Sequence, residues 1–89
     1  MSDETVQTWL VERSYGNDED LVTLVYATAD GERQLTKQLS HRMLMGREIT
    51  AGRQISPDRL EAVDDEETRE RYRAEAARMV DSHDPDEAV

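Results

Sequence analysis

The dipeptide Asp30-Gly31 stands between two stretches in which apolar and polar residues alternate. Residues 21–29 before it, L-V-T-L-V-Y-A-T-A, are the most apolar stretch of the chain, and residues 33–39 follow it. Asp-Gly suits a two-residue type I′ turn because both central residues of that turn need positive φ. The sequence therefore predicts a β-hairpin whose two strands are joined at Asp30-Gly31.

The second strand of this hairpin has an alternative. Apolar side chains spaced four apart between residues 35 and 43 also fit a single helix over residues 32–45. The hairpin signal favours the strand, and Ser40 would then cap a short helix over residues 41–45. From the sequence, this part of the chain is either a strand followed by a short helix or one helix.

Besides the two hairpin strands, the sequence predicts one further strand and leaves a second one open. A run of β-branched and aromatic residues predicts a strand over residues 5–15, and the turn-forming, acidic residues 16–20 separate it from the hairpin. Residues 48–56 are ambiguous, because their apolar side chains suit an edge strand while Gly52 weakens its pairing. Residues 56–59 read as a turn or a single helical turn.

The last predicted element is a helix that begins after Asp64 or Asp65 and ends near Ser82. Aspartates are good N-caps, and the glutamates that follow them favour the positive end of the helix dipole. The helix has an apolar stripe made of Tyr72, Ala76, Met79 and Val80. Residues 83–89 read as an acidic flexible tail.

These elements predict an α+β domain over residues 1–82. We expect a three- to four-stranded antiparallel β-meander that packs against the C-terminal helix in two layers. Residues 21–29 carry apolar side chains on both faces, and one helix is too small to cover both faces of the sheet. Either residues 41–63 fold over the second face or another subunit does, and we therefore predict a homodimer that forms through the sheet.

The charge composition indicates a habitat. The 89 residues carry 21 acidic and 11 basic side chains, a net charge of −10, and Lys37 is the one lysine. This composition is typical of haloarchaeal cytosolic proteins, since molar salt shortens the Debye length to about 3 Å and so weakens the repulsion between surface acids. We expect a cytoplasmic protein. The absence of cysteine excludes disulfides, and no apolar run approaches the roughly 20 residues of a membrane span.

The cations are concentrated in the middle of the chain. Residues 33–59 hold six of them against two acids, a net charge of +4, whereas the stretches before and after each carry −7. A basic segment suggests binding to an anion, a nucleic acid or a partner protein, and the candidate residues are Lys37, Arg42, Arg47 and Arg53. We favour the other interpretation, in which these cations pair with acids of the same or a neighbouring subunit, because aromatic side chains for base stacking are missing here.

No motif predicts catalysis, a metal site or a cofactor. His41 has no serine or aspartate partner at a motif spacing, and the histidine and two aspartates at positions 83, 84 and 86 form a weak metal pattern. We therefore expect a small dimeric, non-enzymatic protein-interaction or regulatory module with a protein partner. The alternative is a binder of nucleic acid or of an anionic ligand that uses residues 33–59.

Three stretches of the chain carry a resemblance to a known group of proteins. They are W-L-V-E-R at 9–13, L-V-Y-A-T-A-D-G-E-R at 24–33 and E-T-R-E-R-Y-R-A-E-A-A-R-M at 67–79. Together they resemble a family of small, acidic, uncharacterised haloarchaeal proteins, over a length from about Thr5 to Val80. The resemblance implies an archaeal cytosolic protein of unknown function, and it brings no catalytic residues and no cofactor.

Overall fold

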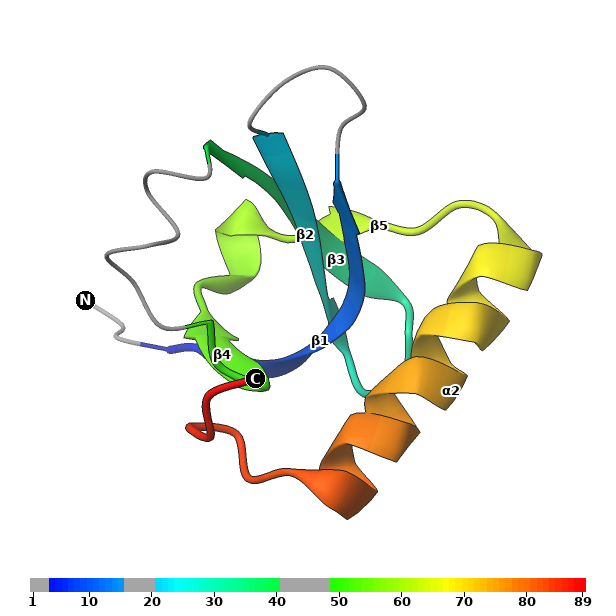
Figure 1. Cartoon of the computed structure of the whole chain (residues 1–89). Coiled ribbons are helices and arrows are strands. Elements are labelled where there is room, and N and C mark those ends of the chain that lie inside the picture. Colours follow the sequence, from blue (N-terminus) through cyan, green and yellow to red (C-terminus); the bar gives the residue numbers. More distant parts are fainter. Residues whose placement is uncertain (1–3, 16–20, 41–48) are drawn as a thin grey trace.

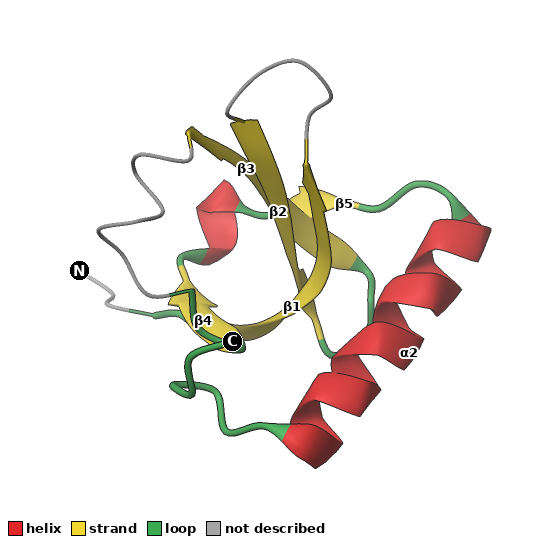
Figure 2. Cartoon of the chain, viewed as in Figure 1, coloured by secondary structure: helices red, strands yellow, loops and turns green. Residues whose placement is uncertain are grey.

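A computed structural model describes residues 4–15, 21–40 and 49–89 of the chain. In this structure an antiparallel sheet is covered on one side by a long helix (Figures 1 and 2). The elements in chain order are β1 (Val6–Tyr15), β2 (Leu21–Thr28), β3 (Arg33–Ser40), β4 (Gly52–Ile55), the 3₁₀ turn η1 (Pro57–Arg59), β5 (Glu61–Ala62) and α2 (Glu66–Ser82).

The described strands are ordered β4-β1-β2-β3-β5 across the sheet, and all neighbouring pairs are antiparallel. The predicted α+β class with a C-terminal helix is confirmed, but the predicted count of three to four strands is too low. The strand that the sequence did not indicate is β5, which is two residues long and pairs with β3 at Arg33 and Gln34. Because β4 lies beside β1, the sheet is a meander only from β1 to β3.

The hairpin of β2 and β3 confirms the strand predicted over residues 33–39, which extends one residue further, but the predicted turn type is wrong. Gly31 has a φ of +73°, and no other described residue has a positive φ, as a type I′ turn would require of Asp30. Asp30 instead accepts hydrogen bonds from the Thr28 hydroxyl and the Glu32 N–H, which hold the loop in another conformation. The predicted helix over residues 41–45 lies outside the described residues.

The side of the sheet that faces α2 carries one hydrophobic cluster. Its buried members are Trp9, Val11, Val25, Ala27, Val63, Tyr72 and Ala76. Each large apolar side chain buried in this way contributes about 1.5–3 kcal/mol to stability. The predicted helix stripe is correct for Tyr72, Ala76 and Met79, whereas Val80 is 48% exposed because it lies about 80° around the helix from Tyr72.

The opposite side of the sheet carries a second hydrophobic cluster. Its buried members are Leu10, Val22, Leu24, Tyr26 and Ile55, and Ile49 and Leu60 pack against them. The side chains of β2 therefore divide between the two faces as predicted. Of the two ways to cover this face, the described part of residues 41–63 supplies the first. The homodimer stays a prediction.

Strand β1 bends strongly along its length (Figure 1). Its register with β2 shifts at Val11, and such a bulge bends the strand and redirects the residues after it. Glu12 consequently faces α2, where its carboxylate accepts a hydrogen bond of 2.8 Å from Arg71. Arg13 faces the other side of the sheet together with its pairing partner Leu24.

Helix α2 begins and ends close to the predicted positions. Asp65 is the N-cap, and its carboxylate accepts hydrogen bonds from the hydroxyl and the backbone N–H of Thr68, at 2.7 and 2.9 Å. These two bonds lower the pKa of Asp65 from its ordinary value. None of the helices in the described residues is long and apolar enough to cross a membrane.

Candidate functional site

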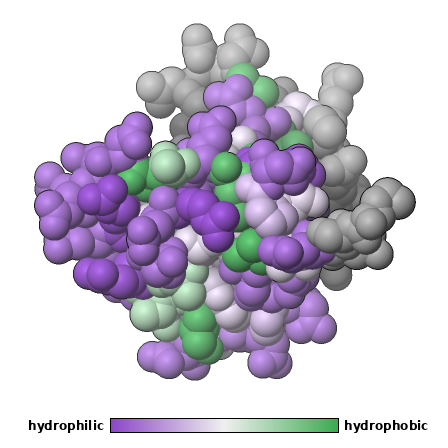
Figure 3. All heavy atoms as spheres, turned by 180° about the vertical axis from the view of Figure 1, so that it is seen from behind, coloured by the Kyte–Doolittle hydropathy of each residue, from purple (hydrophilic) through white to green (hydrophobic). Residues whose placement is uncertain are grey.

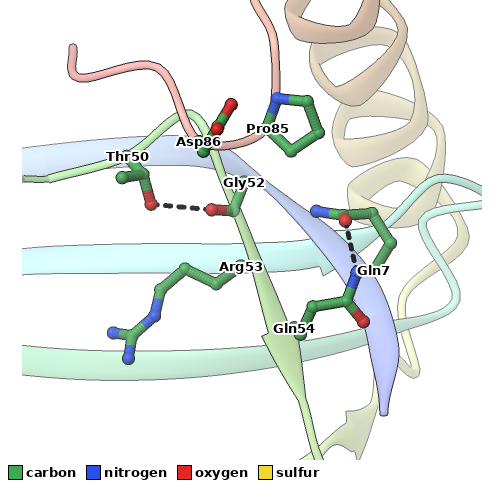
Figure 4. Close-up of a pocket in the computed structure, with 7 residues that line it drawn as sticks. All are labelled: Gln7, Thr50, Gly52, Arg53, Gln54, Pro85 and Asp86. Atoms are coloured by element: carbon green, nitrogen blue, oxygen red, sulfur yellow. Dashed lines mark hydrogen bonds between the residues drawn. The ribbon is translucent and has the colours of Figure 1, made fainter.

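A pocket of about 540 Å³ lies where the beginning of β1, strand β4 and the C-terminal segment (residues 84–89) meet (Figure 4). Most of the side chains around it are polar, and they come from parts of the chain that are far apart in sequence. The lining residues are Gln7, Thr50, Gly52, Arg53, Gln54, Pro85 and Asp86. We call this feature the β4 pocket.

The floor of the β4 pocket depends on Gly52. A Cβ atom at this position would lie 2.8 Å from the Thr8 carbonyl oxygen and 2.6 Å from Nε2 of Gln7, which is closer than real Cβ contacts allow. Because Gly52 has no side chain, β4 can approach β1 closely, and Pro85 can approach Gly52. The Cβ of Pro85 would lie 3.2 Å from a Cβ added at Gly52. The glycine that weakened the strand prediction is thus the residue that allows three segments to meet.

The polar side chains of the pocket are fixed by hydrogen bonds. Nε2 of Gln54 donates to Oε1 of Gln7 at 2.7 Å, and Nε2 of Gln7 donates to the Thr8 carbonyl oxygen at 2.9 Å. The Thr50 hydroxyl donates to the Gly52 carbonyl oxygen at 2.7 Å (Figure 4). The two amides join β1 to β4 directly, so the pocket wall is ordered before any ligand arrives.

Arg53 adds a positive charge above an aromatic ring. Its guanidinium carbon lies 5.9 Å from the ring centre of Tyr26, within the range of a cation–π interaction. The Tyr26 hydroxyl donates to the Thr50 carbonyl oxygen at 3.2 Å. Burial raises the pKa of Tyr26 above its ordinary value, while the nearby charge of Arg53, the bond to Thr50 and the charge of Arg13 oppose the rise.

Pro85 and Asp86 of the C-terminal segment line the pocket (Figure 4), and the segment pairs with the chain just before β4 (Figure 2). The N–H groups of Ala51 and Gly52 donate to the carbonyl oxygens of Glu87 and Pro85, and the N–H of Val89 donates to Ile49, each at 2.8 Å. Residues 50 and 88 form an antiparallel bridge. We call the outer side of residues 49–54 the β4 edge. How flexible the tail is in solution stays a prediction.

The structure describes two of the four predicted binding residues, and it does not bring them together in one pocket. Lys37 lies on β3 and Arg53 on β4, on the same face of the sheet but with strands β1 and β2 between them. Leu24 of β2 pairs with Lys37 on one side and with Arg13 on the other, so these two cations flank one apolar residue. Arg42 and Arg47 lie outside the described residues.

Sequence reasoning missed Arg13, Gln7 and Gln54. Simple alternation along β1 would place Arg13 on the face that α2 covers. The register shift at Val11 moves it to the opposite face, and the sequence gives no sign of this bulge. The two glutamines are 47 positions apart, and only the pairing of β1 with β4 makes them neighbours. Among the described residues, no group of three histidine, cysteine or carboxylate side chains is placed to hold a metal ion.

The chemistry that the β4 pocket offers is recognition by hydrogen bonds. Two amides, a threonine hydroxyl, one guanidinium and one carboxylate line it, and no histidine, serine or cysteine is among its lining residues. Residues 49–52 of the β4 edge are already bonded to the C-terminal segment, and beyond them the outer side of β4 offers backbone groups, the usual means by which a sheet binds an extended peptide. An extended polypeptide is therefore the ligand that the site fits best.

Comparison with known proteins places the chain in a family. Residues 2–89 match the family of unknown function DUF7967, so the chain belongs to this family over nearly its whole length. No curated protein and no solved structure matches the chain. The predicted membership in a family of unknown function is confirmed, and the predicted haloarchaeal origin is not addressed by this match.

Proposed function

We propose that this member of the family is a small dimeric interaction module that binds a protein partner and does not act as an enzyme. The observation that carries the proposal is the β4 edge, because a sheet edge with an ordered polar pocket beside it suits an added strand. The proposal includes a salt-rich cytoplasm as its place of action. The net charge of −10 supports this part.

The surface supports binding through polar and backbone groups. The face in Figure 3 is mostly hydrophilic, and its apolar residues occur in small separate areas. Among the described residues, only three large apolar side chains are exposed, namely Leu21, Val80 and Val89, and they belong to different elements. A partner that approached this face would find little apolar area to cover, so strand pairing at the β4 edge is the more effective mode.

The dimer is tested by measuring the mass of the chain in solution. Light scattering during size-exclusion chromatography in molar KCl is expected to give twice the chain mass of 10.2 kDa at micromolar to millimolar protein. The salt is needed because self-repulsion of an acidic chain opposes association at low ionic strength. A mass of one chain across this whole range would contradict the proposal.

The alternative function is binding of a nucleic acid or of another anion, and one observation favours it. Arg13, Lys37 and Arg53 face the same side of the sheet, so three cations from separate strands share a surface. Arg53 is exposed and lines the β4 pocket. Its guanidinium lies over Tyr26, whereas the paired amides of Gln7 and Gln54 point to the other side of β4 (Figure 4), so a phosphate would be held by the face that carries the cations.

Fluorescence anisotropy of a labelled single-stranded oligonucleotide tests the alternative. If it is correct, Arg53→Gln weakens binding by about tenfold, because a hydrogen bond to a charged group contributes about 1.5–3 kcal/mol. Arg59→Gln is the matched control, since Arg59 is also exposed but lies on η1 and does not line the pocket. Equal binding by the two variants, or no binding by the native chain at the lowest salt concentration at which circular dichroism shows it folded, would count against it.

A further inference from the structure

At the beginning of the β4 edge, two backbone N–H groups donate hydrogen bonds to the C-terminal segment. Ala51 is fully buried and Gly52 is buried too, and their N–H groups point away from β1 toward the C-terminal segment. A buried N–H without a partner is strongly unfavourable, because neither water nor protein compensates for its lost hydration. An extended segment along residues 49–52 therefore stabilises the fold, because it supplies acceptors to these N–H groups and covers them.

The segment that fills this place is held almost entirely by its backbone. Residues 84–89 are all exposed, and they bind residues 49–52 through three backbone hydrogen bonds, two of which form the bridge between residues 50 and 88. Their side chains contribute little hydrophobic stabilisation, because so little of their surface is buried. A segment attached in this manner exchanges readily for another copy of itself, since the second copy makes the same bonds.

The β4 pocket lies beside the part of β4 that follows the residues bonded to this segment. Residues two apart in a strand direct their backbone groups to the same side, so Gln54 directs its N–H and carbonyl outward as Gly52 does. Among the described residues, no strand pairs with this outer side of Gln54. The chain runs from the end of α2 to the C-terminal segment (Figure 1), which first meets the edge at Pro85, and Pro85 and Gln54 both line the β4 pocket (Figure 4).

His83 joins α2 to the C-terminal segment, and one polar atom of its side chain is buried there with no hydrogen bond to the described part of the chain. His83 caps the helix by donating its N–H to the Met79 carbonyl oxygen at 2.9 Å. Its Nδ1 atom is buried and has no hydrogen-bond partner among the described residues, and its Nε2 atom lies 3.8 Å from the Glu87 carboxylate. A straightened link would free this nitrogen for water or for a new partner.

The geometry points to an exchange of C-terminal segments between two copies of this chain. Residues 85–89 of each copy lie along residues 49–52 of the other, and the straightened residues 82–84 lie in the β4 pocket beside Gln54. The second copy is the occupant because this chain's own segment is the peptide that the structure shows on the edge. Two reciprocal exchanges close the assembly as a dimer, so the inference rests on the proposed dimeric state and names its interface.

A disulfide across the observed bridge tests the exchange, because the native chain contains no cysteine. Two single variants, Thr50→Cys and Ala88→Cys, are mixed, unfolded, refolded together in molar KCl and oxidised. Neither variant can form a disulfide within one chain at this bridge, so a disulfide that joins the two variants requires a segment that crosses between copies. With equal amounts of the two variants, random pairing makes about half of the dimers mixed, so we expect up to about half of the protein to run as a covalent dimer on a non-reducing gel and as single chains after reduction.

A matched control measures disulfides that form by collision. In it, Thr50→Cys is paired with Glu67→Cys, a position that is exposed on α2 and takes no part in the bridge. Circular dichroism confirms that each variant is folded. Cross-linking no greater than this control would overturn the exchange, as would the double variant Thr50→Cys/Ala88→Cys forming its disulfide within single chains only.

These results separate the exchange from the proposed function. If the native chain has the mass of a dimer and the mixed variants do not cross-link, the dimer stands and the exchange is wrong. If the native chain has the mass of one chain and the mixture does not cross-link, both are wrong. Cross-linking well above the control, together with the mass of a dimer, supports both.

Discussion

Gly31 lies where the β2–β3 turn meets the backbone of α2. A Cβ atom there would be 2.3 Å from the Arg69 carbonyl oxygen and 2.9 Å from the backbone nitrogen of Arg73. Its φ of +73° is in addition a conformation that residues with a side chain avoid. One position therefore fixes both the path of the hairpin and the distance between sheet and helix.

Gly31→Ala is expected to lower the free energy of unfolding by about 2–5 kcal/mol, the sum of backbone strain and of a contact that only a shift of α2 can relieve. Urea denaturation in molar KCl measures the change. Ala29→Gly, in the same turn, is the control and is expected to cost under about 1 kcal/mol. Similar stabilities of the two variants would show that α2 does not pack against this turn as described.

Asp30 in the same turn links stability to pH. The Thr28 hydroxyl, and after it the Glu32 N–H, stabilise the carboxylate and lower its pKa from the ordinary value. Because the folded pKa is the lower one, this contribution is complete above the unfolded pKa of about 3.9 and is lost as the pH falls through the folded pKa. Asp30→Asn is therefore expected to be less stable than the native chain at pH 6, by less than about 1 kcal/mol.

The measurement is thermal unfolding of both proteins between pH 6 and pH 2.5. The difference in Tm between them is expected to shrink as the pH falls, because protonation removes the advantage of the native carboxylate. A difference that stays constant over the whole range would show that the Asp30 carboxylate is not stabilised in the fold.

At the level of elements, β4 and the C-terminal segment depend on each other. Residues 49–52 donate and accept across the β4 edge, so removal of residues 84–89 takes away the acceptors of the Ala51 and Gly52 N–H groups. Each lost hydrogen bond is expected to cost about 0.5–1.5 kcal/mol. The segment predicted to be a flexible tail forms backbone hydrogen bonds and an isolated bridge beside β4, and its flexibility stays a prediction.

Hydrogen exchange of a chain that ends at His83 tests this dependence. The amides of Ala51 and Gly52 are expected to exchange at least about tenfold faster than in the full chain, since their bonds to the tail are gone. Amides in the middle of β2, such as that of Val25, are the internal control and keep their protection. Equal protection of Ala51 and Gly52 in both chains would show that another segment covers the edge.

The elements differ in how well the sequence predicts them. The turn at Asp30-Gly31 and the N-cap at Asp65 act locally, and they correctly located two strands and the helix. The bulge at Val11 and strand β5 have no local signal, because pairing with distant residues creates them. For the same reason, only Arg53 of the β4 pocket was predicted as a binding residue.

For the whole molecule, the net charge of −10 predicts a dependence on salt. The acidic ends of the sequence are expected to repel each other at millimolar KCl and to expand or unfold the chain, whereas molar KCl screens them. Asp81→Asn should lower the salt requirement, because Asp81 is an exposed acid in the last turn of α2, where a negative charge opposes the helix dipole. A circular dichroism spectrum that is the same at millimolar and molar KCl would contradict this prediction.

If the protein associates through its β4 edge as proposed, loss of the C-terminal segment removes the dimer. This is measured by sedimentation velocity of the full chain and of the chain that ends at His83, both in molar KCl. We predict that the full chain sediments as a dimer, whereas the shortened chain, shown to be folded by circular dichroism, sediments as a single chain. A full chain that sediments as a monomer at every concentration, or a shortened chain that remains fully dimeric, would contradict the claim.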